Sequence, residues 1–227
     1  MARVLFGLTG SVASIKAVEV ARALSGAGHT VRLAMTRSAG YFLSPDDWNA
    51  LGPLCDGLFQ DSDEWPRERY QRGQAIAHIA LRDWCDLLLI APLDAHTLAK
   101  TANGFADNLL TSILRAWNFT RPMVLAPAMN THMWHHPVTA KHLGELAGFF
   151  GVSEELPRWN SDDPAQGMES LVQSIHAATG RLRLVSPIKK VLACGDEGVG
   201  AMADPREIAS AVSEMAKKLV PPKTAPE

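Results

Sequence analysis

The chain has 227 residues, 47% of them hydrophobic and 20% charged, a composition typical of globular proteins. This length favours one domain, which we expect over residues 1–220 with a loose tail over 221–227. A formal net charge of −2 makes nucleic acid a poor candidate for a partner. No run approaches the roughly 20 apolar residues of a membrane helix, so no membrane segment is expected.

The three cysteines, Cys55, Cys85 and Cys194, have no paired spacing. That usage indicates a thiol-reducing compartment, and we expect the protein in the cytoplasm. The apolar start at residues 4–8 is soon interrupted by Thr9 and Gly10, so it predicts a first strand and no signal peptide.

Strand and helix patterns alternate along the first half of the chain. Residues 3–9 and 30–35 predict strands, and residues 12–24 predict a helix with Ile15, Val18, Ala21 and Leu24 on or near one face. Residues 46–73 are polar and rich in turns, so only short elements are expected there.

The plainest buried strand covers residues 85–91, ended by Pro92 and preceded by a turn at 79–84. Residues 97–117 predict one long helix, or two helices broken near Asn103 and Gly104. A strand over 121–126 and a helix over 136–146 complete the alternation.

The rhythm breaks at residues 155–180, which are rich in Ser, Asp, Pro and Gly. We expect an exposed insertion there, around a short helix at 168–178. The end of the chain predicts a last strand (182–185), a glycine-rich loop (193–202) inside a substrate flap (188–203), and a final helix (205–219). Together these units predict an α/β fold: a Rossmann-like, flavodoxin-like doubly wound parallel sheet with helices on both faces.

Polar residues follow the first two predicted strands. Gly10, Ser11 and Val12 open a helix, and a glycine with a hydroxyl at a helix start suits a phosphate, although an ordinary capped turn has the same pattern. The second strand ends without the acid that holds a dinucleotide ribose. Its end instead supplies Thr36, Arg37 and Ser38, which favour a mononucleotide phosphate.

Two further strand ends carry polar groups. One has Asp94, Ala95, His96 and Thr97, and the other has Ala128 and Asn130. Carboxyl ends of parallel strands share one edge of a sheet, so all four ends should surround one crevice. The Asn130 amide can donate two hydrogen bonds to a carboxylate there. Phe42 either covers an aromatic ring or belongs to the core.

Two residues are candidates for proton transfer. His78 is either a base or a structural histidine. Cys194 lies among three glycines, which indicates a flap that exposes the thiol, unless it is an incidental loop cysteine. His132, His135 and His136 have no acid or cysteine at ligand spacing, so no metal site is expected.

The run P-A-M-N-x-x-M-W at 127–134, together with segments 9–16, 78–79, 91–97, 107–110 and 193–196, resembles one family. These segments occur in the order found in the phosphopantothenoylcysteine decarboxylases, which are flavin-dependent cysteine decarboxylases. The resemblance covers roughly residues 3–153 and 186–212. Two positions depart from it: His96 stands where the family usually has Asn, and Val191 where a basic residue is common.

The resemblance implies an enzyme of coenzyme A biosynthesis, a homotrimer that binds FMN between subunits. Its small-molecule substrate would be 4′-phosphopantothenoylcysteine and its product 4′-phosphopantetheine. By the same resemblance, FMN contacts would come from Gly10, Ser11, Val12, Thr36, Arg37, Ser38, Phe42, Asp94, Ala95, His96, Thr97 and Ala128. Catalytic roles would fall to His78, Asn130 and Cys194, and substrate contacts to Asn130, Met133 and Ala193.

The implied chemistry oxidises the substrate thiol to a thioaldehyde, releases carbon dioxide, and then reduces the enethiol while Cys194 gives a proton. His78 would act as base and Asn130 would hold the carboxylate. Two alternatives stay open. One is a regulatory homologue that binds FMN and inhibits a protein phosphatase, and the other is a flavin or nicotinamide oxidoreductase.

Overall fold

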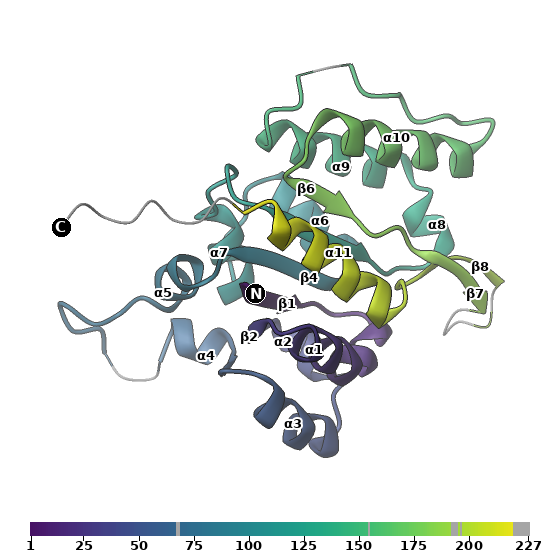
Figure 1. Cartoon of the computed structure of the whole chain (residues 1–227). Coiled ribbons are helices and arrows are strands. Elements are labelled where there is room, and N and C mark those ends of the chain that lie inside the picture. The colour runs from purple at the N-terminus through teal and green to yellow at the C-terminus, as the bar shows by residue number, and fades with distance from the viewer. Residues whose placement is uncertain (67–68, 154, 192–194, 196, 220–227) are drawn as a thin grey trace.

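A computed structural model describes residues 1–66, 69–153, 155–191, 195 and 197–219. Its centre is a six-stranded sheet in the order β3-β2-β1-β4-β5-β6, with every neighbouring pair parallel. Helices cover both faces (Figure 1), so the predicted fold class is confirmed. The strands are β1 (Arg3–Leu8), β2 (Thr30–Met35), β3 (Leu58–Phe59), β4 (Leu87–Leu93), β5 (Met123–Pro127) and β6 (Leu182–Leu184).

The central strands are apolar because both of their faces are covered. All seven residues of β4 are buried. The prediction that Pro92 ends this strand was wrong, since β4 continues to Leu93 and its register with β5 shifts between Ile90 and Leu93. A proline has no N–H to donate to a ladder, and such an irregularity accommodates it.

The two faces of the sheet carry separate apolar clusters. One cluster joins the sheet to α1 (Ala17–Gly26), α3 (Pro45–Leu51) and α11 (Pro205–Lys217). The other joins it to α5 (Ala77–Trp84), α6 (Ala95–Ala102), α7 (Leu109–Arg115), α9 (Pro137–Phe149) and α10 (Pro164–Ala178). Short helices connect these layers: η1 (Val12–Lys16), α2 (Arg37–Gly40), η2 (Gly52–Leu54), α4 (Asp61–Glu64) and α8 (Thr131–Trp134).

The first helix differs from its prediction. It begins as the 3-10 helix η1 and becomes α-helical only at Ala17. Three residues per turn instead of 3.6 change the direction of each side chain, so Ile15 is 55% exposed while Val20 and Leu24 are buried. The prediction that Ile15 shares the apolar face of this helix was therefore wrong.

The structure also decides where two helical regions begin and end. Residues 79–84, expected as a turn, belong to α5. Of the two possibilities for residues 97–117, the broken helix is correct: α6 ends at Ala102, and Gly104 takes a positive φ of 73° before α7 begins.

The expectation of an exposed insertion over residues 155–180 is wrong for α10. Met168, Leu171, Val172 and Ile175 are buried in the second cluster, at the spacing of one helix face. α10 packs against α9 and leads into β6, so it completes a crossover between two parallel strands. The polar residues that suggested an insertion lie on the other side of the helix and before it.

Residues 197–201 of the expected glycine-rich loop form a strand. β7 (Ile188–Val191) and β8 (Glu197–Ala201) form an antiparallel hairpin that projects from the end of the sheet (Figure 1). Residues 192–194 and 196 lie outside the described part of the chain. Among the described helices, none combines the length and the apolar character that crossing a bilayer requires.

Candidate functional site

The strand order locates the ligand-binding edge of the sheet. Without the two-residue β3, the order is β2-β1-β4-β5-β6, which is the flavodoxin-like arrangement. The chain moves from β1 outward in one direction to β2 and later in the other direction from β4 to β6. The switch point therefore lies between β1 and β4, at their carboxyl ends, where open parallel sheets bind ligands.

A buried hydroxyl ties these two strand ends together. Thr9 Oγ1 donates to the Pro92 carbonyl oxygen at 2.8 Å and accepts from the Asp94 backbone N–H at 2.8 Å. Thr9 is fully buried, and its own carbonyl accepts from Ser14 Oγ at 2.8 Å. These hydrogen bonds consequently fix the distance between the loop after β1 and the loop after β4.

Gly10 brings a third loop to the same place. A Cβ added to Gly10 would lie 2.6 Å from Ser38 Cβ and 3.3 Å from Asp94 Oδ2. Only a residue without a side chain therefore fits between the loops that follow β2 and β4. Thr36 Oγ1 caps α2 by accepting from Ala39 N at 3.2 Å. The structure therefore confirms that the loops after β1, β2 and β4 meet, but not that all four strand ends surround one crevice. Residues 36–38 and 94–97 do not line the cavity beside this junction.

Next to this junction is a cavity of about 410 Å³. Its walls come from Ser11 and η1, from the segment after β5 and from the β7–β8 hairpin with the residue that follows it. Most of the lining is apolar, and the polar side chains in it belong to Ser11, Lys16, Asn130 and Lys190. The other lining residues are Val12, Ala13, Ile15, Ala128, Met129, Val191, Gly200, Ala201 and Met202.

Asn130 is held at the mouth of this cavity by helix capping. Its Oδ1 accepts from His132 N at 2.8 Å as the N-cap of α8. On the other side, Met129 N donates to the Gly200 carbonyl at 3.0 Å, which joins the hairpin to the segment after β5. The strand end of β5 is therefore linked to β8 as well as to the sheet.

The glycines of β8 permit this contact. A Cβ at Gly200 would collide with the Met129 carbonyl oxygen, and one at Gly198 would collide with the Thr131 hydroxyl. The sequence pattern suggested that these glycines provide mobility. In the structure they also provide a close approach between two backbones, which the pattern alone did not distinguish.

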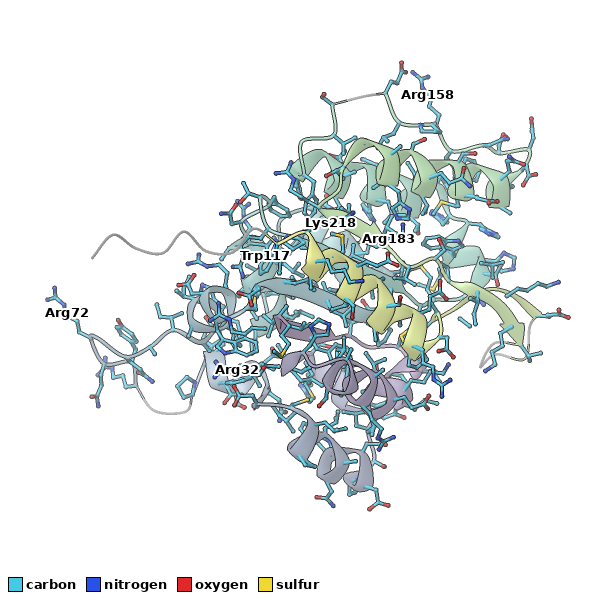
Figure 2. The ribbon with its side chains drawn as sticks, viewed as in Figure 1. Arg32, Arg72, Trp117, Arg158, Arg183 and Lys218 are labelled. Carbon is cyan, nitrogen blue, oxygen red and sulfur yellow. The ribbon has the colours of Figure 1, made fainter. Side chains whose placement is uncertain are left out.

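His78 does not line the cavity that contains Asn130. It lines a hollow of about 420 Å³ together with Trp65, Tyr70 and Ile76. Arg72 stands at the tip of the segment between α4 and α5 (Figure 2), on the side away from the β7–β8 hairpin (Figure 1). The structure of one chain therefore does not bring His78 to the cavity that contains Asn130.

The partner of His78 was missed from sequence. Glu64 Oε1 lies 2.6 Å from His78 Nδ1, and Glu64 Oε2 accepts from the His78 backbone N–H at 2.8 Å. The only signal in the sequence was an acid fourteen positions before the histidine, in a segment that showed no regular pattern.

The remaining predicted residues are spread around these features. Asp94 caps α6 by accepting from Thr97 N at 2.6 Å, and Ala95 and His96 follow it in the first turn, with His96 exposed. Phe42 is half-buried, makes an edge contact with Tyr41 at 5.2 Å between ring centroids, and is not among the residues that line the cavity. Met133 is 48% exposed on α8. Ala193 and Cys194 lie outside the described residues.

The two described cysteines are poor candidates for proton transfer. Burial raises the pKa of the Cys55 and Cys85 thiols to about 11 in each case. A raised pKa makes each thiol a weaker acid, and neither cysteine lines the cavity that contains Asn130. Of the three cysteines in the sequence, this leaves Cys194 as the candidate acid.

The chain belongs to the flavoprotein family, whose model matches residues 1–217. Within that family it is similar to phosphopantothenoylcysteine decarboxylases: it is 39% identical to the mouse protein over 211 residues, which are 92% of this chain and 85% of the relative.

Solved structures agree with this similarity. One is a cysteine-to-serine mutant of PPC decarboxylase complexed with pantothenoylaminoethenethiol, with a TM-score of 0.75, 38% identity, and coverage of 95% of this chain and 98% of that one. Another is the FMN binding protein AtHal3, with a TM-score of 0.74, 38% identity, and coverage of 96% and 98%.

Proposed function

We propose that the protein is an FMN-dependent decarboxylase that converts 4′-phosphopantothenoylcysteine to 4′-phosphopantetheine in coenzyme A biosynthesis. The main support for this proposal is the position of Asn130. Its side-chain amide follows β5 and lines one cavity together with Ser11 and with Gly200 and Ala201 of β8. The similarity to phosphopantothenoylcysteine decarboxylases, at about 39% identity over nine-tenths of the chain, supports this substrate.

The donor set around the cavity fits FMN. Apolar side chains of Val12, Ile15 and Met202 suit a flat aromatic ring, and the hydroxyl of Ser11 suits a phosphate. Ser38 does not line the cavity, but it packs against Gly10 next to Ser11 and offers a second hydroxyl. Arg37 adds a positive charge at the same edge of the sheet. The tight packing of Gly10 keeps these groups close together. In this proposal Asp94, Ala95, His96, Thr97, Thr36, Phe42 and Ala128 complete the FMN site.

FMN, when bound, would accept two electrons from the substrate cysteine and later return them. The chain's own residues would orient the substrate and transfer its protons. Asn130 would hold the carboxylate that leaves as carbon dioxide, because its amide can donate while its oxygen stays in the α8 cap. His78 would take the thiol proton, and Met133 and Ala193 would contact the substrate.

Cys194 would give the last proton. A relative 38% identical to this chain has a cysteine-to-serine mutant complexed with pantothenoylaminoethenethiol, an enethiol. An enethiol is what remains when carbon dioxide has left and the final reduction has not occurred. That complex supports the assignment of a matching cysteine, and Cys194 is the one in the predicted flap.

We also propose a homotrimer with FMN at the subunit interfaces. Apolar side chains near the cavity are exposed in the single chain, among them Val12 at 44%, Ile15 at 55% and Met133 at 48%. Exposed apolar surface of this kind is typical of an interface. A neighbouring copy would also supply the His78 that each chain keeps apart from its own Asn130. The cytoplasm remains the proposed compartment.

A regulatory homologue that binds FMN and inhibits a protein phosphatase is the second candidate. It stays a candidate because some similar structures are named only as HAL3, at 31% identity for the one from Cryptococcus neoformans, or as an FMN binding protein, with no stated enzymatic activity. Such a protein would hold FMN without needing His78 or Cys194. This chain has both residues, which favours the enzyme.

A turnover assay separates the two candidates. Purified FMN-loaded protein is given 4′-phosphopantothenoylcysteine, and carbon dioxide and 4′-phosphopantetheine are measured. We expect turnover by the natural chain, and carbon dioxide with accumulated enethiol from Cys194→Ser. Asn130→Asp preserves the cap acceptor of α8 but repels the substrate carboxylate, so kcat/KM should fall about 100-fold, which corresponds to about 2.7 kcal/mol. Bound FMN without any turnover would reject the enzyme and leave the regulatory candidate.

A further inference from the structure

The contact between Glu64 and His78 is bidentate: each carboxylate oxygen of Glu64 contacts a different nitrogen of His78. One carboxylate oxygen accepts from the His78 backbone N–H at 2.8 Å, and the other lies 2.6 Å from Nδ1 of the ring. The two hydrogen bonds fix both the start of α5 and the orientation of the imidazole. A residue that served only to cap the helix would need the first bond alone.

Burial makes this contact strong. The Glu64 side chain is 7% exposed and that of His78 is 23% exposed. Water therefore competes little for the carboxylate, and the charge-assisted bond is stronger than a surface contact. The ring is still partly exposed, and His78 lines the hollow.

The carboxylate itself is held by the rest of the fold. Glu64 is the last residue of α4, whose Asp61 Oδ1 accepts from the backbone N–H of Leu109 at 2.9 Å. Leu109 opens the buried helix α7. Glu64 is thus connected to the core, and the ring of His78 is connected through Glu64.

We propose that Glu64 is a positioning residue that keeps the proton of neutral His78 on Nδ1. An ionised carboxylate has only lone pairs to offer, so the ring nitrogen facing it must be the donor. The lone pair is then on Nε2, which is the nitrogen that accepts the substrate proton. When His78 becomes positively charged, Glu64 lies beside it and stabilises the imidazolium. This inference rests on the proposed function of His78.

Glu64→Gln tests this role of Glu64 because it changes the hydrogen-bonding groups and the charge while it preserves the shape of the side chain. A glutamine has one acceptor oxygen, which can replace only one of the two carboxylate oxygens that face the backbone N–H and Nδ1. If the oxygen remains on the backbone, the amide NH2 faces Nδ1 and forces the proton onto Nε2. We expect kcat to fall at least about 100-fold with a much smaller change in KM, as when the orienting acid of a triad is lost. Glu64→Asp, which retains two acceptors, should recover part of the rate.

The tautomer is read directly by ¹⁵N NMR of histidine-labelled, FMN-loaded protein, on the alkaline side of a pH titration where the His78 signals no longer change with pH and therefore report the neutral ring. His78→Asn identifies the His78 signals among the eight histidines. We expect Nδ1 protonated in the natural chain and Nε2 protonated in Glu64→Gln. Glu169→Gln, in an exposed i,i+4 contact with Gln173, is the matched control and should change neither tautomer nor rate.

The outcomes distinguish the two proposals. A natural chain with the proton on Nε2, or a Glu64→Gln variant with unchanged tautomer and kcat, would overturn the positioning role. The expected tautomers without any decarboxylation by the natural chain would support the positioning of the ring and reject the proposed function.

Discussion

The Thr9 hydroxyl accepts a hydrogen bond from the Asp94 backbone N–H at 2.8 Å, across the switch point of the sheet. The same hydroxyl donates to the Pro92 carbonyl. One small polar side chain therefore sets the distance between the first loop of the chain and the loop that opens α6. The geometry of the proposed FMN site depends on this distance, since groups from both loops contribute to it.

Thr9→Val removes both hydrogen bonds while preserving shape. The Pro92 carbonyl would lose this partner in a buried contact, and the Asp94 N–H would lose it in a part-buried one. We expect the free energy of unfolding to fall by about 2–3 kcal/mol, because each unsatisfied buried group costs about 1–3 kcal/mol. Urea denaturation measures the change. Thr120→Val, which removes an exposed hydroxyl, should stay within about 0.5 kcal/mol. Equal effects of the two variants would contradict the role given to Thr9.

Gly10→Ala tests whether the close approach of three loops is needed for flavin. The new methyl group would overlap Ser38 Cβ, so the loops must separate, at a cost of about 1–3 kcal/mol. We expect FMN to bind at least about tenfold more weakly, which corresponds to about 1.4 kcal/mol. Flavin fluorescence titration measures the affinity.

Gly26→Ala is the matched control for that variant. Gly26 is the last residue of α1, and an added Cβ there would meet no atom within 4 Å. FMN affinity should be unchanged and stability unchanged or slightly raised. Flavin binding by Gly10→Ala that equals that of Gly26→Ala would remove Gly10 from the proposed site.

Stability should decline in mild acid because of His176, a partly buried histidine on α10. Burial lowers the pKa of His176, and the charge of Arg183, labelled in Figure 2, lowers it further. His176 Nε2 accepts from Leu184 N at 3.0 Å, which requires the neutral ring. The unfolded chain then binds more protons than the folded one below about pH 6.5, so the free energy of unfolding falls as pH decreases through that range.

His176→Gln isolates this contribution. Its uncharged side chain retains an acceptor for Leu184 but has no proton to take up. We expect the free energy of unfolding to depend less on pH between about pH 7 and pH 5. His29, His135 and His142, whose pKa values burial also lowers, will keep part of the slope. Denaturant titrations at several pH values measure it, and an unchanged slope would exclude His176 as a source.

The sequence by itself determined the sheet and its ligand edge. Buried apolar runs such as β4 are visible as continuous hydrophobic stretches, because strands covered on both faces need no polar residue. Polar residues at strand ends are equally visible, since parallel strands place all of those ends at one edge. Asn130 and Gly10 therefore stand out in the sequence as candidate site residues.

Tertiary structure alone decided the contacts between distant segments. The apolar face of α10 could not be recognised as core, because its burial depends on packing against α9, and the surrounding composition is polar. Nothing local indicated that β8 lies on Met129 or that Glu64 reaches His78. Periodicity reports which face of an element is apolar, whereas a hydrogen bond between side chains far apart in sequence exists only once the chain has brought them within about 3 Å.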